Sequence, residues 1–355
     1  MTFRPAAALW IANPTVDLVF FSLGWIPLYA VFAAINAVSP KGPGIAFLIG
    51  FVLMTNFIHR NLTHVLVYGN RDEFNERKWS YLLLPVFFAA ITVWSLWYQK
   101  AVRTSPLLFK PYLGLLVATT LWNFYHTIMQ KVGFLRIYSR KTGYGSVFLD
   151  KAMVLSWFVT LCLGVANSQR IIQDISKLAS SGRVLVKTLT SLSPVLPVLA
   201  YVSLAASLVI TVLYLRTEIA QGREASLPKN LFLGSTLLLY ASVFYDFLAG
   251  FVAFGFSHAL EYIAFVDVYA RKKYGSAEAD SSFLAACYQK TGAVMLAAGL
   301  VLVAVFLPWR LLSPVTLGWY YVGSSFLHYL YDGWIWKLRK PKVGAPLGLA
   351  YEQAS

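Results

Sequence analysis

The segment GIAFLIGFVLMTNFIHRNLTH, residues 44–64, decides the fold of this chain. Residues 44–54 are apolar, and the segment then ends in a polar run, residues 56–64, with two histidines, an arginine and two asparagines. A helix of about 20 apolar residues crosses the hydrocarbon core of a bilayer. Polar groups in such a segment are costly because lipid offers them no hydrogen-bond partner, so this run is a candidate functional site.

The rest of the chain has the composition of a polytopic membrane protein. Its 355 residues are 58% hydrophobic and 13% charged, with a formal net charge of +15, whereas about 25% of the residues in a soluble domain are charged. Lys and Arg stand in short clusters between apolar segments, where they act as topology signals and contact anionic head groups. We therefore expect no nucleic-acid partner. Cys162 and Cys287 lack a CxxC spacing and predict no thiolate metal site.

Hydropathy predicts an all-α fold of about ten transmembrane helices, forming one domain over residues 1–355. The stretch 230–270 is too long for one crossing, so we divide it at Phe247–Gly250; whether the seventh and eighth spans are separate is open. The predicted spans are 15–36, 44–68, 79–98, 112–135, 147–169, 194–215, 230–246, 250–270, 291–308 and 315–336.

Two features of the connections bear on topology. The loop after the fifth span has a mixed apolar and basic pattern, which predicts a helix over 170–192 lying on the membrane surface. With the N-terminus inside, the inner connections hold about twice as many Lys and Arg residues as the outer ones, which favours both termini in the cytoplasm. We expect the protein in the cytoplasmic (inner) membrane of a prokaryote.

The chain contains five histidines, and all of them fall in even-numbered spans. They are His59 and His64 in the second span, His126 in the fourth, His258 in the eighth and His328 in the tenth. Even-numbered spans run in the same direction across the membrane, and each histidine precedes a basic cluster that marks the cytoplasmic surface. We therefore expect all five to lie at a similar depth in the inner half of the bilayer.

Other polar side chains share helix faces with these histidines. Glu261 and Tyr262 follow His258 by three and four residues, and Tyr331 and Asp332 follow His328 in the same way. Side chains at these offsets lie on one face of a helix. His59 and His64 are five residues apart, about 140° around an ideal helix, so both reach one centre only if the helix ends, bulges or lies tangent to it.

This set of residue types points to a metal. A single transmembrane histidine is often only an interhelical hydrogen-bonding group, but five at one depth favour ligation. Neutral imidazoles suit a site of low dielectric, and one or two carboxylates balance part of a dication's charge. The pattern predicts non-heme iron, with zinc as the alternative. The expected ligands are His59, His64, His126, His258 and His328, with Asp332 or Glu261 in addition.

The arrangement resembles that of the integral-membrane, histidine-rich non-heme iron enzymes. The HxxxH and HxxHH boxes of fatty-acid desaturases and hydroxylases are absent. The closer resemblance is to the microbial membrane β-carotene cleavage dioxygenases, in which a few histidines are spread over transmembrane helices. In this chain the two histidines of the HRNLTH run, residues 59–64, are the counterpart of that family's closely spaced histidine pair. This resemblance implies oxygen chemistry on a lipid-dissolved substrate.

We therefore expect a membrane-embedded non-heme iron oxygenase or oxidoreductase that acts on a lipid-soluble isoprenoid or acyl substrate. Asp332 would be a ligand or orient one, Glu261 would carry protons, and Tyr262 or Tyr331 would donate a hydrogen bond to a ligand. The sequence does not identify the electron donor. Two alternatives stay open: a haem-binding electron carrier and a proton-coupled transporter. A Soret band would indicate haem, and weak ferric or ferrous absorption would indicate non-heme iron.

Overall fold

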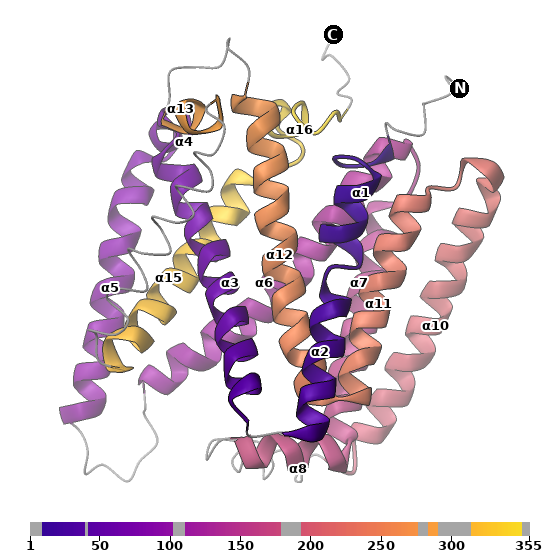
Figure 1. Ribbon diagram of the computed structural model, residues 1–355, viewed down its shortest axis with the longest axis horizontal. Coiled ribbons are helices and arrows are strands. Elements are labelled where there is room, and N and C mark those ends of the chain that lie inside the picture. Colours follow the sequence, from indigo (N-terminus) through magenta and orange to yellow (C-terminus); the bar gives the residue numbers. More distant parts are fainter. Residues whose placement is uncertain are drawn as a thin grey trace. The chain divides into compact units, whose positions relative to one another are not determined.

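The computed structural model describes residues 9–39, 42–101, 111–178, 193–275, 283–289 and 314–349. All regular secondary structure in these ranges is helical, without a strand, which confirms the predicted all-α class (Figure 1). The elements, in chain order, are α1 (Pro14–Val16), the π-helical turn η2 (Asp17–Ser22), α2 (Trp25–Val38), α3 (Pro43–Tyr68), α4 (Arg71–Glu76), α5 (Lys78–Ala101), α6 (Pro111–Thr142), α7 (Val147–Asn167), α8 (Gln169–Leu178), α10 (Leu196–Ala220), the 3-10 turn η3 (Gly222–Glu224), α11 (Leu227–Tyr245), α12 (Phe247–Tyr274), α13 (Phe283–Gln289), α15 (Pro314–Ile335) and α16 (Pro341–Gly344).

Six segments of the described chain are long and apolar enough to cross a membrane. They are Pro14–Val38, Pro43–Tyr68, Lys78–Tyr98, Val147–Asn167, Leu196–Ala220 and Phe247–Tyr274. Large aromatic side chains on these segments are exposed, among them Phe47, Trp79 and Tyr201, each at least 70% exposed. Such surfaces are unfavourable in water and favourable in lipid. The protein is therefore a membrane protein. The predicted span 291–308 lies outside the described residues.

The predicted division of the stretch 230–270 corresponds to a real break. Helix α11 ends at Tyr245 and α12 begins at Phe247, so the two are separate helices. Asp246 forms the turn, and its Oδ1 accepts a hydrogen bond from the backbone N–H of Ala249 at 3.0 Å. This bond satisfies one of the N–H groups that the first turn of α12 leaves without a helical partner. The break falls just before the predicted position.

Helix α6 extends further than the predicted span 112–135. Its last turns, which run to Thr142, carry Arg136 and Ser139, and both hydrogen-bond to Oδ2 of Asp150 on α7, at 2.6 and 2.7 Å. Hydropathy marks the end of the apolar stretch, whereas the helix continues because its polar residues have partners on a neighbouring helix.

The start of the predicted surface helix at 170–192 is helical. Helix α8 covers Gln169–Leu178, and residues 179–192 lie outside the described ranges. The guanidinium of Arg170 hydrogen-bonds to the backbone oxygens of Phe244 and Tyr245, which fastens α8 to the last turn of α11. Two apolar residues of this helix, Ile171 and Ile172, are buried.

The described chain divides into two compact units. The first comprises residues 1–53, 128–261 and 348–350, and the second comprises 54–127, 262–347 and 351–355. Three helices, α3, α6 and α12, have one part in each unit because each division falls inside a helix.

In the first unit, α7 packs against α10 and α11, and η2 packs against α11 (Figure 1). An apolar cluster joins α2, the first part of α3 and the first part of α12, with Phe32 and Ala249 fully buried in it. The indole of Trp25 donates a hydrogen bond to Ser235 Oγ at 2.9 Å, which ties α2 to α11.

In the second unit, α5 runs beside α15 (Figure 1). The buried core of this unit is rich in aromatic side chains, and Tyr81, Tyr262 and Tyr331 are almost completely buried in it. These rings come from α5, α12 and α15, and the second part of α3 contributes Leu66 and Val67. The polar run that ends α3 therefore lies in a packed region of the second unit.

Candidate metal centre

Three of the five histidines lie close together in the second unit. His59 is on α3, His126 on α6 and His328 on α15, and their ring nitrogens offer ligand atoms within 4.8 Å of one another. We call these three residues the histidine group. Nε2 of His328 lies 3.1 Å from Nε2 of His126. The ring centroids of His59 and His328 are 4.4 Å apart, and the two rings meet nearly at right angles.

Asp332 contributes a carboxylate to the histidine group. It lies one turn after His328 on α15, and its Oδ2 is 3.6 Å from Nε2 of His126 and 3.6 Å from Nε2 of His328. Asp332 is 6% exposed and His328 is fully buried. The predicted placement of Asp332 on the same helix face as His328 is therefore observed.

These distances fit one metal ion. Nitrogen and oxygen ligands bind Zn²⁺ at about 2.0–2.2 Å. Neighbouring ligand atoms of such an ion are then separated by about 2.9–3.5 Å, depending on whether the geometry is octahedral or tetrahedral. The 3.1 Å between the nitrogens of His126 and His328 lies in this range, and the two distances of 3.6 Å to Asp332 lie just above it. Small rotations of the side chains would bring the three residues onto one ion.

Thr63 orients His328 from the side away from His126. The Thr63 hydroxyl donates to Oδ1 of Asp332 at 2.8 Å and lies 2.7 Å from Nδ1 of His328. Because the Thr63 hydroxyl proton points at the carboxylate, the hydroxyl oxygen can only accept from His328. The contacts therefore place the proton of the His328 ring on Nδ1. Nε2 of His328 then carries a lone pair that faces His126. Metal-binding histidines are held in this way, with the other ring N–H donated to a polar partner.

Tyr262 completes the hydrogen bonds to the carboxylate. Its hydroxyl donates to Oδ1 of Asp332 at 2.7 Å, lies 2.6 Å from the Thr63 hydroxyl and accepts from the Trp336 indole at 3.2 Å. The Tyr262 ring meets the His59 ring edge-on, with centroids 4.6 Å apart. Tyr262 therefore donates to the carboxylate next to the histidine group.

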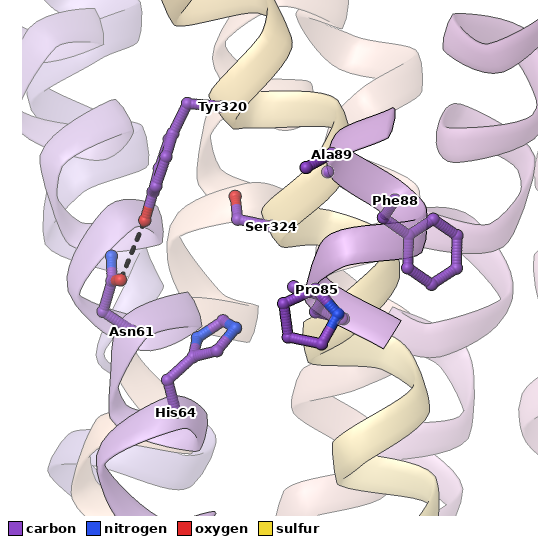
Figure 2. A pocket seen from close by; sticks show the side chains of 9 residues that line it. Asn61, His64, Pro85, Phe88, Ala89, Tyr320 and Ser324 are labelled. Carbon is purple, nitrogen blue, oxygen red and sulfur yellow. Dashed lines mark hydrogen bonds between the residues drawn. The ribbon is translucent and has the colours of Figure 1, made fainter. Parts of the chain in front are cut away.

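The structure does not bring His64 into the histidine group. Helix α3 is a regular α-helix through residues 59–64, so the separation of about 140° between His59 and His64 is retained. Nδ1 of His64 is 3.1 Å from the backbone oxygen of Arg60, and its ring meets Tyr331 edge-on at 5.6 Å. His64 lines a separate pocket (Figure 2).

The two remaining metal-site candidates lie on α12 in the first unit. His258 is 2% exposed, and its backbone oxygen accepts a hydrogen bond from Gln130 Nε2 at 2.9 Å. Glu261 is fully buried and forms an ion pair with Lys131 of α6. Ser257 Oγ also donates to Glu261, at 2.6 Å. Because several donors hold this carboxylate, the contacts favour a fixed charge partner for Lys131 over a mobile proton carrier.

Tyr331 lies among aromatic rings of the second unit. Its hydroxyl is 3.0 Å from the hydroxyl of Tyr68, and its ring packs edge-on against Tyr81 with centroids 4.9 Å apart. These contacts give it a packing role, and the structure shows no hydrogen bond from Tyr331 to the described residues of the histidine group.

Two important residues escaped the sequence analysis. Thr63 is four residues after His59, so helical spacing could have identified it. Lys131 stands among the basic residues that follow His126 in the sequence, although it is only 2% exposed and paired with Glu261. Nothing in a single sequence distinguishes such a buried lysine from its solvated neighbours.

No protein-family model matches the chain, and neither a curated protein nor a solved structure is significantly similar to it.

Proposed function

We propose that the histidine group and Asp332 bind one metal ion, and that the ion is iron. The observation that carries the proposal is the placement of two imidazole nitrogens 3.1 Å apart with a carboxylate oxygen 3.6 Å from both. If Nε2 of His328 carries a lone pair, as its bond with Thr63 indicates, a shared proton or a bound metal is needed to hold His126 so close.

The donor set supports iron over most alternatives. Several imidazoles with one carboxylate, leaving positions for other ligands, are typical of non-heme iron sites, and zinc is the second choice. Haem fits less well at His126 and His328, because axial nitrogens at about 2.0 Å on opposite sides of an iron are about 4 Å apart with the macrocycle between them. The separation of 3.1 Å leaves no room for that arrangement.

His258 is the proposed fourth histidine ligand. It lies on α12, one turn before Tyr262, and α12 is a continuous helix from Phe247 to Tyr274. Tyr262 contacts His59 and Asp332. Side chains four residues apart lie on the same helix face, so His258 and Tyr262 share a face of α12.

We further propose that the protein is a membrane oxidoreductase, in the first instance an oxygenase, acting on a lipid-soluble isoprenoid or acyl substrate. The support is that His59 lies on α3, a helix with the length and hydropathy of a membrane span. When bound, iron would supply the redox chemistry. In this chain Thr63 and Tyr262 would fix the carboxylate of Asp332, and Thr63 would hold the proton of His328 on Nδ1.

The proposed topology has ten spans and both termini in the cytoplasm of a prokaryote, as the distribution of Lys and Arg favours. Reporter fusions test it directly. Fusions after Lys78, Arg140 and Arg223 should score as cytoplasmic, and a fusion after Ser168 should score as external. An external Lys78 together with a cytoplasmic Ser168 would invert the proposal.

Metal analysis of detergent-purified protein, with an absorption spectrum, tests the function. We expect stoichiometric iron, without a Soret band, in the wild type. His126→Ala, His328→Ala and Asp332→Asn should each lower metal affinity on the order of 100-fold or more, because they remove ligands. His64→Ala is the matched control and should retain the metal. His258→Ala tests the fourth ligand in the same assay.

Three results would contradict the proposal. A Soret band would favour the electron carrier, and metal-free protein would favour the proton-coupled transporter. Full metal in all three ligand variants would show that the ligands lie elsewhere.

A further inference from the structure

A pocket of about 230 Å³ lies between α3, α5 and α15 in the second unit. Its walls are mostly apolar, with Pro85, Phe88 and Leu327 among them, and Figure 2 shows the ring of His64 extending toward Pro85 from α3. A cavity of about 150 Å³ lined by apolar side chains is enough to bind benzene. This pocket therefore has room for a ring or for several carbons of a chain.

Among the polar groups of this pocket, the ring of His64 offers a hydrogen-bond acceptor. Tyr320 donates to Oδ1 of Asn61 at 2.8 Å (Figure 2). The Asn61 amide in turn donates to the backbone oxygen of Phe57 at 2.9 Å. Nδ1 of His64 donates to the Arg60 oxygen, since a carbonyl only accepts. This bond fixes the tautomer and leaves Nε2 of His64 as an acceptor, and no hydrogen bond within the described chain reaches it.

The pocket borders the exposed apolar surface of helices that can span a membrane. Helices α3 and α5 are both candidate membrane spans, and Val86 and Phe87, next to the pocket residue Pro85, are 66% and 55% exposed. A molecule that reaches this surface comes from the lipid phase. It is therefore apolar over most of its length.

The pocket is also next to the proposed ligands along the chain. Ser324, which lines the pocket, is one turn before His328 on α15, and Leu327 directly precedes His328. Arg60 follows His59 on α3, donates to Ser324 Oγ at 3.3 Å and stacks over Tyr321. The same two helices thus carry pocket residues and metal ligands.

We propose that the pocket binds a lipid-soluble alcohol, whose apolar body packs against Pro85, Phe88 and Leu327 and whose hydroxyl donates a hydrogen bond to Nε2 of His64. The proposal rests on the proposed function in one respect: it names the substrate class of that site. His64 then serves as a specificity-determining residue. Its neutral ring is an acceptor, and a substrate without a hydroxyl or other donor would leave it without a partner in the pocket.

Gly323 gives a way to close the pocket without disturbing the helix. It lines the pocket, and a Cβ built on it meets no neighbouring atom within 4 Å. A leucine at this position therefore extends into open space, and leucine is a better helix former than glycine. Gly114 on α6 is the matched control, because a Cβ there is equally unobstructed and Gly114 does not line the pocket.

The test is the binding of cis-parinaryl alcohol and its methyl ether to the purified full-length protein, measured by energy transfer from tryptophan. The wild type should bind the alcohol roughly tenfold more tightly than the ether, as one hydrogen bond implies. His64→Phe should lower alcohol affinity to that of the ether and leave ether affinity unchanged. Gly323→Leu should weaken both probes at least tenfold, and Gly114→Leu should weaken neither.

Metal content is measured on the same samples, so that this proposal and the proposed function can fail separately. His64→Phe and Gly323→Leu should keep the metal content of the wild type. His328→Ala should lose metal and still bind the alcohol. Equal affinity of the wild type for alcohol and ether, or unaltered binding by Gly323→Leu, would overturn the pocket proposal whatever the metal content.

Discussion

Replacing Thr63 by valine removes one hydroxyl and keeps the branched shape of the side chain. The hydroxyl is fully buried and contacts three partners: Nδ1 of His328, Oδ1 of Asp332 and the Tyr262 hydroxyl, at 2.7, 2.8 and 2.6 Å. The carboxylate loses a donor, and the His328 Nδ1–H loses its acceptor. A hydrogen bond to a charged group contributes about 1.5–3 kcal/mol, so we expect Thr63→Val to lower the free energy of unfolding by about that amount.

The same change should weaken metal binding. Removing a polar group that orients a ligand typically lowers metal affinity 10–100-fold, which corresponds to about 1.4–2.7 kcal/mol. Metal titration of the stripped protein gives the affinity, and chemical or thermal unfolding in detergent gives the stability. Thr63→Ser keeps the hydroxyl and should retain most of the affinity.

Thr92→Val is the matched control for burial. Thr92 is also fully buried, but its hydroxyl bonds at 2.6 Å to the backbone oxygen of Phe88, one turn earlier on its own helix. We expect this variant to keep its metal affinity. Wild-type affinity in Thr63→Val, or an equal loss in Thr92→Val, would refute the inference that Thr63 orients His328.

Two further predictions concern charges outside the histidine group. Lys131→Met leaves Glu261 buried without its cation and should cost about 3–5 kcal/mol of stability, whereas adding Glu261→Gln should recover much of it; equal unfolding midpoints for the single and double variants would contradict this coupling. At the end of α4, hydrogen bonds from Lys340 and Lys342 lower the pKa of Glu76 to about 2, so the stabilisation they give is present above pH 4.5 and lost as the pH falls toward 2. Hydrogen exchange in α16, corrected for intrinsic rates, should show this loss in the wild type and not in Glu76→Gln, and identical profiles would count against it.

The helices could be predicted from the sequence because hydropathy and helix breaks are local properties. The predicted span 44–68 corresponds to α3 at Pro43–Tyr68, and the predicted break near residue 247 corresponds to the turn at Asp246. The ends of α6 could not be predicted in this way. Its last turns are stabilised by Arg136 and Ser139 bonding to Asp150 on another helix, and hydropathy does not contain that information.

The site was predictable to the extent that helical spacing determines which face a side chain occupies. Spacing placed Asp332 beside His328, and it also showed that His59 and His64 point in different directions. Spacing does not say which partner a face will meet. The pairing of Lys131 with Glu261 and the contact of Thr63 with His328 both join helices distant in sequence, so only the folded structure reveals them.

The carboxylate of Asp332 gives the strongest electrostatic reason to expect a cation at the histidine group. It is buried, and in the described chain its ion-pair partners are the two histidines, without a Lys or Arg. Arg60 is engaged by Ser324 and Tyr321. Hydroxyl donors such as Thr63 lower the cost of a buried carboxylate but do not neutralise its charge. The charge is balanced either by a proton, on the carboxylate itself or on a histidine, or by a metal ion. Metal binding displaces that proton, so loading the stripped protein should release protons, and the release should be smaller in Asp332→Asn, in which the buried negative charge is absent.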